Sequence, residues 1–500
     1  MNRTEFPRCT PEAVGISSAA IQRFLDKLES GFTEMHGLMI MRRGKVCAEG
    51  WWTPYAPGLR HGLQSHTKTW AATAVGIAVR EGLVRLDERI IDIFPEFAPE
   101  NPSENLQLLT VHNVLSMGCG METMPAPTEN WIRDFLATPV VHKPGTAYMY
   151  NSTGSSLLSA IVRKRSGESM MDYLKPRLFD KIGVDASNLR CALMPDGCEV
   201  GGGGMLATTE DNLRLMKLYA DGGVWNGEQI LSPEYVRLAT TNQNDSASEA
   251  NNTPPALVNF VGYGYQIWMC RPSGVYRADG AMGQFTIVDP SRELIIAINE
   301  TATGAHWAQQ TLNVCWEFLD EIDPDTAMMP ENEELSSALA RRMRCLSIPN
   351  PPYAPFGKFP VPGEYYQAES GIHPDNVILS HMSGESVGAG MTAFSFHPAD
   401  NDQVVRMEIV FNGQELSLTI PMDGSRQMQQ MPGGLVSKVC LSGYWKEENV
   451  FAVRFRWVET CFEKELSFRF DGNGCTVTEE ETVGGFFAKE VNPVQAFLCK

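Results

Sequence analysis

The chain has 500 residues, of which 43% are hydrophobic and 20% are charged, and its formal net charge is −19 at pH 7. This length exceeds what a single hydrophobic core usually holds, so we expect two domains. The acidic charge argues against binding of nucleic acids and against docking on anionic membranes.

Two further features bear on the cellular location. The N-terminal residues lack the apolar segment of a signal peptide, and no run of eighteen apolar residues could span a bilayer. The twelve cysteines are dispersed without a CxxC pair, and several lie in apolar segments, for example Cys315, Cys440 and Cys461. We therefore expect buried free thiols and a cytoplasmic location.

The first elements lead to a short polar motif. Apolar residues at helical spacing predict a helix over 11–30, and two apolar runs around an Arg-Gly turn, 37–42 and 45–50, predict a hairpin. An irregular segment rich in proline and glycine, 52–62, then leads to a helix that begins near Ser65.

Helices continue through the middle of the chain. The patterns predict a short helix over 110–117, a helix after the Pro144-Gly145-Thr146 turn, and another over 169–179. Four glycines, 201–204, then precede a helix with Thr208 or Thr209 as its N-cap. The glycines could cradle a phosphate, but no Lys-Ser/Thr follows as in a P-loop, so a close backbone approach beside a pocket is favoured.

The last third of the chain changes from mixed to all-β patterns. Segments 263–269, 274–290 and 293–299 predict successive antiparallel strands, covered by a helix over 306–319. Residues 331–355 are rich in proline and acidic residues and predict a linker between a first domain, 1–330, and a second, 356–500. Short alternating runs with Asn-Gly and Asp-Gly turns predict a sandwich or barrel for the second domain.

Ser65 and Lys68 form the candidate chemical centre. Because residues three apart share a face of a helix, the hydroxyl and the amine can meet. A partly desolvated lysine can act as a base near neutral pH, and a helix N-terminus favours an oxygen that becomes negative. The alternative is an ordinary helix, capped by Ser65, with Lys68 in solvent.

Two other segments could complete this centre. Tyr150 lies where a loop enters a helix, and its phenol could pass a proton to a leaving group, although a packed tyrosine is the simpler interpretation. The glycine-rich segment 278–283 could present the N–H of Ala281 as an oxyanion donor beside that of Ser65; otherwise it is a plain β-bulge.

Other motifs are weaker. Residues 384–388, Gly-Glu-Ser-Val-Gly, match the nucleophile elbow of α/β-hydrolases, but the surroundings predict strands and only His397 lies downstream. There is no HExxH and the nine histidines are dispersed, so we predict no metal and no cofactor. Only His66 is placed to reach the cleft.

These residues carry a family resemblance. The run Ser65-His-Thr-Lys68, followed by Tyr150-Asn-Ser152 and Ala278-Asp-Gly280, resembles the three motifs of the class C β-lactamase-like serine hydrolases. That superfamily includes penicillin-binding DD-peptidases, family VIII esterases, D-aminopeptidases and nylon-oligomer hydrolases. The resemblance extends over about residues 11–320, and the β domain is similar to an accessory domain of some relatives.

The resemblance implies a fold and roles. The fold is an α+β arrangement in which an antiparallel sheet is flanked by helices and an all-helical lobe. Ser65 is the acylated nucleophile, Lys68 and Tyr150 handle protons, and the N–H groups of Ser65 and Ala281 form the oxyanion hole. Substrate contacts are expected from six residues: His66, Asn151, Ser152, Asp279, Gly280 and Gln284.

Departures from the family's motifs narrow the class of substrate that we expect. The second motif usually ends in Asn, whereas Ser152 stands here, and the third usually begins with Lys or His, whereas Ala278 stands here. No cation is then available for a carboxylate. We therefore predict a small ester or amide substrate, with a β-lactamase or DD-peptidase as the alternative and a non-catalytic binding protein as the second. Homo-oligomerisation is left open.

Overall fold

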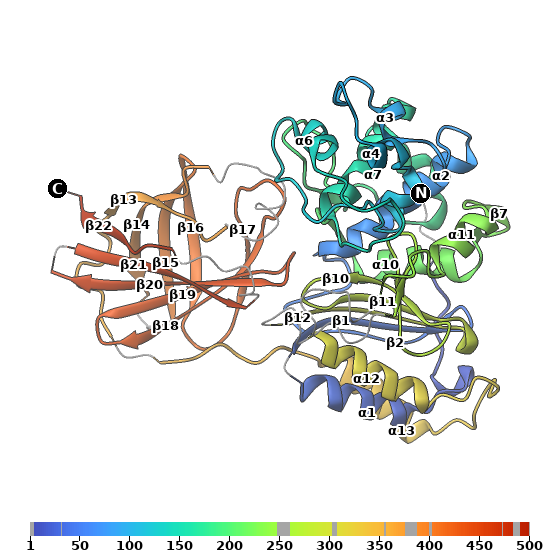
Figure 1. The fold of residues 1–500 in the computed structure, drawn as a ribbon. Helices are drawn as coiled ribbons and strands as arrows, with labels where there is room; N and C mark the ends of the chain where they lie inside the picture. The colour runs from blue at the N-terminus through green and yellow to red at the C-terminus, as the bar shows by residue number, and fades with distance from the viewer. Residues whose placement is uncertain are drawn as a thin grey trace.

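The computed structural model describes residues 5–31, 33–247, 261–302, 308–354, 357–375, 388–399, 403–472, 474–483 and 491–499. Figure 1 shows two parts side by side, an N-terminal part built on a sheet with helices on both faces and a C-terminal part built of strands alone. The predicted fold class is confirmed. The predicted domain limits remain a prediction.

The N-terminal part is built around an antiparallel sheet of seven strands in the order β2-β1-β12-β11-β10-β9-β8. The predicted hairpin at its edge is confirmed, because β1 pairs with β2 across Arg43-Gly44. The strands are β1 (Thr33–Arg42), β2 (Lys45–Trp51), β8 (Gly262–Tyr263), β9 (Trp268–Met269), β10 (Tyr276–Gly280), β11 (Gln284–Asp289) and β12 (Leu294–Ala302).

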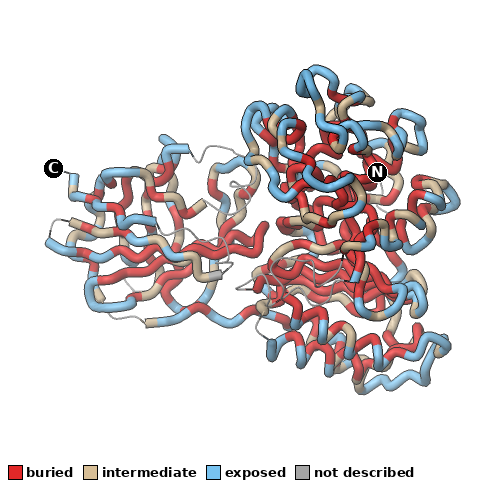
Figure 2. The backbone as a smooth tube through the Cα atoms, in the orientation of Figure 1, coloured by how far each residue is buried: buried red, intermediate tan, exposed pale blue. Residues whose placement is uncertain are grey.

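Helices cover both faces of this sheet (Figure 1). One face carries α1 (Ser18–Glu29), α12 (Ala308–Asp320) and α13 (Glu333–Arg344); the last of these lies within the range predicted to be a linker. The other face carries α10 (Thr209–Ala220), α2 (Thr67–Arg80) and α7 (Ser152–Ser166). Figure 2 shows the strands between these layers buried along most of their length, as the core requires.

Short elements complete this part. They are α3 (Ile90–Ile93), α4 (Glu104–Leu108), α5 (Val111–Leu115), α6 (Trp131–Ala137), α8 (Met170–Leu174), α9 (Asp180–Ile182) and α11 (Pro233–Ala239), the turns η1 (Glu12–Val14), η2 (Gln64–His66), η3 (Lys175–Phe179) and η5 (Pro290–Arg292), and the strands β3 (His61–Gly62), β4 (Arg190–Cys191), β5 (Met205–Ala207), β6 (Val224–Trp225) and β7 (Glu228–Gln229).

Three predicted elements differ from the structure. The single strand predicted over 274–290 is wrong, because it is divided into β10 and β11, which pair with each other across residues 281–283. The helix predicted over 11–30 is divided, because Gly15 (φ +76°) ends η1 and Ser17 caps α1 by accepting from the N–H of Ala20. The single strand predicted over 263–269 is wrong. Gln266 has φ +56° and reverses the chain, so that β8 and β9 pair with each other.

The C-terminal part is an antiparallel sheet of ten strands that curls into a nearly closed barrel (Figure 1). Its edge strands are β16 and β17. The side-chain amide of Gln429 in β17 connects them, because it accepts from the N–H of Thr419 in β16 and donates to the carbonyl of Thr419, both at 2.7 Å. The strands are β13 (Tyr366–Ile372), β14 (Met391–Pro398), β15 (Val404–Phe411), β16 (Gln414–Pro421), β17 (Gln427–Gln430), β18 (Lys438–Glu447), β19 (Val450–Trp457), β20 (Phe462–Asp471), β21 (Gly474–Val483) and β22 (Val494–Leu498).

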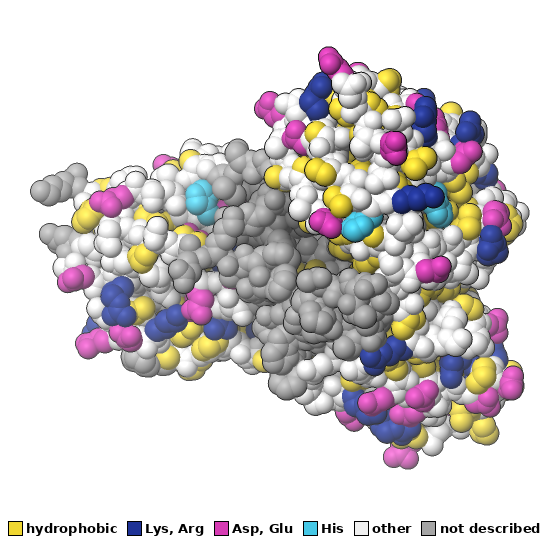
Figure 3. All heavy atoms as spheres, viewed as in Figure 1, with side chains coloured by type: hydrophobic (Ala, Val, Ile, Leu, Met, Phe, Trp, Pro, Cys, Tyr) yellow, Lys and Arg dark blue, Asp and Glu magenta, His cyan; other side chains and the backbone are white. Residues whose placement is uncertain are grey.

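The predicted free thiols are present in the structure. All twelve cysteines are free, and eight of them are buried. On the face seen in Figure 3, acidic and basic side chains are interspersed rather than gathered by sign. Within the described part of the chain, no helix is long and apolar enough to cross a membrane. The predicted cytoplasmic location remains a prediction.

Candidate active site

Ser65 lies in a tight turn at the start of α2. It is the middle residue of η2, and α2 follows directly with Thr67. The preceding residue, Gln64, has φ +50°, a conformation that costs a non-glycine residue about 1–3 kcal/mol. The surrounding structure must hold this turn in place, and Ser65 itself remains partly exposed.

Lys68 is one helical turn further on and is buried, with 1% of its surface exposed. Its Nζ lies 3.0 Å from Ser65 Oγ and 3.1 Å from Ser152 Oγ, and it also donates to the carbonyl of Gly202. Burial lowers the pKa of Lys68 to about 7, against a smaller opposing effect of the Asp279 carboxylate. A large fraction of Lys68 is therefore neutral at physiological pH and able to accept a proton.

Tyr150 approaches the same pair from the loop before α7. Its ring lies beneath Lys68, with Nζ 4.7 Å from the ring centroid. Burial raises the pKa of the Tyr150 phenol, and a hydrogen bond to Ser65 opposes this only in part. The phenol is therefore protonated when Lys68 is neutral, which suits an acid better than a base.

The glycines before α10 bring a carbonyl to Lys68. A Cβ on Gly202 would lie 2.3 Å from the carbonyl oxygen of Ser152, and one on Gly201 would lie 2.4 Å from Ser159 Oγ. Only glycine permits this contact with α7, so the predicted close backbone approach is present. The Gly202 carbonyl as a partner of Lys68 was not predicted.

The end of β10 packs against the turn that carries Ser65. A Cβ on Gly280 would lie 2.1 Å from the carbonyl oxygen of Leu63 and 3.1 Å from the N–H nitrogen of His66. Ala281 follows in the turn to β11, where Met282 and Gly283 have φ +67° and +93°. This approach places the Ala281 backbone beside the turn of Ser65.

Asp279 is not a free carboxylate. Its Oδ2 lies 2.8 Å from Arg277 Nε, and burial raises the pKa of Asp279 while Arg277 opposes that effect. Arg277 also lies over the ring of Trp268, which packs against Tyr150. Ala278, between the two charged residues, is fully buried. The Arg277–Asp279 pair was not predicted, and the spacing of two residues on one strand was the signal that could have indicated it.

Three of the predicted substrate contacts, Asn151, His66 and Gln284, are buried and bonded within the protein, and their contact with a substrate remains a prediction. Asn151 is fully buried, and its Oδ1 caps α7 by accepting from the N–H of Gly154 at 2.8 Å. His66 Nε2 bonds Thr286 Oγ1 at 3.0 Å, and burial lowers its pKa to about 4. Gln284 is fully buried between the Glu300 carbonyl (2.6 Å) and the Asn299 amide (2.9 Å).

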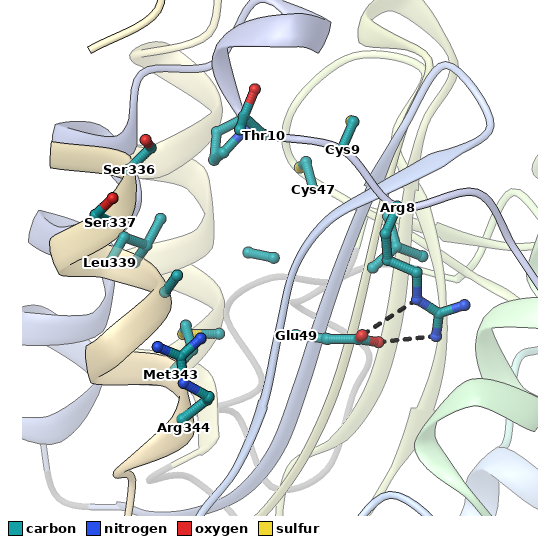
Figure 4. A pocket seen from close by; sticks show the side chains of 14 residues that line it. Arg8, Cys9, Thr10, Cys47, Glu49, Ser336, Ser337, Leu339, Met343 and Arg344 are labelled. Atoms are coloured by element: carbon teal, nitrogen blue, oxygen red, sulfur yellow. Dashed lines mark hydrogen bonds and ion pairs between the residues drawn. The ribbon is translucent and has the colours of Figure 1, made fainter. Parts of the chain in front are cut away.

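Two other regions are separate from this site. A groove of about 650 Å³ lies between α13 and β2, and Figure 4 shows Cys47, Glu49, Leu339 and Met343 along it. None of the candidate residues lines this groove. The elbow-like motif at 384–388 has its first four residues outside the part of the chain that the structure describes.

Comparisons with known proteins identify the family of this chain. A model of the Beta-lactamase family matches residues 25–313. The 6-aminohexanoate-dimer hydrolase of Paenarthrobacter ureafaciens is 23% identical over 312 residues, covering 57% of this chain and 78% of that protein. Penicillin-binding protein 4 of Amycolatopsis lactamdurans is 26% identical over 254 residues, covering 44% of this chain and 65% of that protein.

Among solved structures, an octameric penicillin-binding protein homologue from Pyrococcus abyssi aligns with 96% of this chain and 99% of its own, at 15% identity and a TM-score of 0.47. The family match covers more than half of the chain, and this chain therefore belongs to the Beta-lactamase family. The resemblance inferred from its motifs is confirmed at the level of the family.

Proposed function

We propose that this protein is a serine hydrolase that cleaves an ester or amide bond of a small molecule through an acyl-enzyme on Ser65. The observation that carries the proposal is the 3.0 Å contact between Ser65 Oγ and a buried Lys68 with a pKa of about 7. A nucleophile beside a base that is neutral at working pH is the arrangement that covalent catalysis requires.

The steps follow from the positions of the groups. Neutral Lys68 takes the proton of Ser65 Oγ as this oxygen attacks the substrate carbonyl. The N–H groups of Ser65 and Ala281 stabilise the oxyanion, and the protonated Tyr150 gives its proton to the leaving alcohol or amine. Water then attacks the acyl carbon and gives a proton to the Tyr150 phenolate, and the Lys68 ammonium returns a proton to Ser65 Oγ as this oxygen leaves.

The charges around the site favour a substrate without a carboxylate at this position. Arg277 is 1% exposed and already paired with Asp279, and Ala278 offers no cation. A carboxylate beside Asp279 would lose its hydration without gaining a partner. A neutral or amine-bearing ester or amide fits better, and the name of the Paenarthrobacter relative, a dimer hydrolase, is consistent with an amide.

Labelling with a fluorophosphonate tests the proposal. We expect one adduct on Ser65 by mass spectrometry, and none in Ser65→Ala. Ser386→Ala, which removes the serine of the elbow-like motif, should be labelled at the wild-type rate. An unlabelled wild-type protein would instead favour a binding protein, and steady turnover of nitrocefin would favour a β-lactamase over an esterase or amidase.

Asp279 should tune the pH dependence of the reaction. Its charge raises the pKa of Lys68, so Asp279→Asn is expected to lower that pKa further. The active form has neutral Lys68, so the acidic limb of kcat/KM, which lies near the Lys68 pKa of about 7 in the wild type, should move to lower pH. The exposed Asp325→Asn serves as the control. An unchanged or upward-shifted limb in Asp279→Asn would contradict this assignment.

A further inference from the structure

One hairpin of the barrel ends inside the N-terminal part. The tip between β19 and β20, residues 458–461, is buried: Val458, Glu459 and Thr460 are 0% exposed and Cys461 is 1% exposed. Hairpin turns usually lie at the surface, where water satisfies their backbone. In Figures 1 and 2 the barrel lies directly beside the catalytic sheet, and this tip is covered by that neighbour.

The tip is bonded to the segment that precedes Ser65. The carbonyl of Glu459 accepts from the N–H of Gly62 at 2.8 Å, and the Glu459 carboxylate forms an ion pair with Arg60 at 2.7 Å. The other carboxylate oxygen accepts from the N–H groups of Ser437 and Lys438, at 2.7 and 3.0 Å, which anchors Glu459 in its own domain. A rigid link therefore runs from the barrel to Arg60 and Gly62.

The bond between the tip and Gly62 lies close to the strained residue beside Ser65. Gln64, two residues after Gly62, has φ +50° and is 2% exposed. Because a positive φ at a non-glycine residue persists only when its surroundings enforce it, the tip is one of the supports of the turn. The opposite support is Gly280 of β10, against Leu63.

The barrel also touches the other half of the expected oxyanion hole. Met282, next to Ala281, is part of the barrel's hydrophobic core together with Phe462, and Ala281 packs against that core. Both backbone segments that would hold the oxyanion, around Ser65 and around Ala281, therefore rest on the C-terminal domain.

We propose that residues 458–461 are a positioning element of the active site, in which Glu459 acts through Arg60 and Gly62 on the turn that carries Ser65. The inference rests on the proposed function of Ser65. It assigns the barrel a part in the reaction of its own chain, beyond that of an accessory domain. A displacement of about 1 Å at the reacting group can cost about 100-fold in rate.

The test compares two ion pairs of the same interface. Glu459→Gln keeps the shape of the side chain and removes its charge, and Arg60→Met removes the partner. The control is Arg456→Gln, because Arg456 of β19 pairs with Glu34 of β1 across the same interface. Its connection to residues 60–64 is indirect and runs through Glu34, His36 and His61. Each variant is measured for the fluorophosphonate labelling rate, for kcat and KM with an activated ester, and for Tm.

We expect Glu459→Gln and Arg60→Met to lower the labelling rate and kcat by about 10- to 100-fold with little change in KM. Their combination should be no slower than the slower single variant, since both break one link. Arg60→Lys, which keeps the charge, should recover most of the labelling rate and of kcat. This variant replaces Glu459→Gln in the test if Glu459→Gln does not fold. Arg456→Gln should lower Tm without slowing the labelling.

Two results separate the failure of this inference from the failure of the proposed function. Wild-type protein that is labelled on Ser65, together with Glu459→Gln labelled equally fast, would overturn the positioning role. A wild type without any adduct on Ser65 would overturn the proposed function. In that case amide hydrogen exchange still decides the positioning role: residues 62–66 should exchange faster in Glu459→Gln but not in Arg456→Gln, and equal exchange would refute it.

Discussion

Lys68→Met is expected to lower kcat/KM for an activated ester by about 1000-fold, since a positioned general base contributes roughly 10²- to 10⁴-fold. Methionine has a similar length and no proton acceptor of comparable strength. The limb of the pH profile near 7, set by the pKa of Lys68, should disappear with the side chain. Initial rates between pH 5 and 10 measure both effects, with the exposed Lys175→Met as the control.

The same substitution should not destabilise the fold. Burial lowers the pKa of Lys68 from 10.5 to about 7, so the unfolded chain binds the proton more tightly than the folded one. Below pH 7 this difference in pKa lowers the free energy of unfolding by its full amount. The loss of stability becomes smaller as the pH rises from 7 towards 10.5. Lys68→Met should therefore keep or raise Tm at pH 6. Lys68 would be excluded as the base if Lys68→Met kept full activity. It would also be excluded if a lower Tm of this variant accounted for its loss of rate.

The local part of the site could be predicted from the sequence because its geometry is local. Ser65 and Lys68 meet through the spacing of one helical turn, and the contact of 3.0 Å follows from residues three apart. Asn151 shows the limit of reading motifs alone. An asparagine directly before a helix is a common N-cap, and the Asn151 side chain has that role in the structure, which the motif did not predict.

The non-local part could not be predicted because nothing in the local pattern encodes it. The Gly202 carbonyl reaches Lys68 only after the glycine loop packs on α7, and Glu459 lies almost four hundred residues after Arg60 in the chain. Gln266 is similar: its positive φ is enforced by buried bonds of its side chain to Ser155 and to the carbonyls of Val114 and Leu115. These tertiary contacts outweigh the strand propensity of residues 263–269.

Gly280→Ala is expected to lower kcat/KM by about 100- to 1000-fold, the usual effect of losing one oxyanion donor. The added Cβ would lie 2.1 Å from the carbonyl oxygen of Leu63, so β10 and the turn of Ser65 must move apart. The N–H of Ala281 moves with the strand. Because the oxyanion exists only in the transition state, kcat should fall far more than KM rises.

The control for this prediction is Gly58→Ala, since a Cβ on Gly58 meets no atom within 4 Å and its rate should equal that of the wild type. A boronic acid that forms a tetrahedral adduct with Ser65 adds a second measurement. If β10 supplies the oxyanion donor, Gly280→Ala should weaken the boronate far more than the substrate, because only the adduct places an oxygen between the two N–H groups. Equal losses of affinity for the boronate and the substrate would mean that the substitution merely narrows the cleft. The oxyanion donor would then lie outside β10.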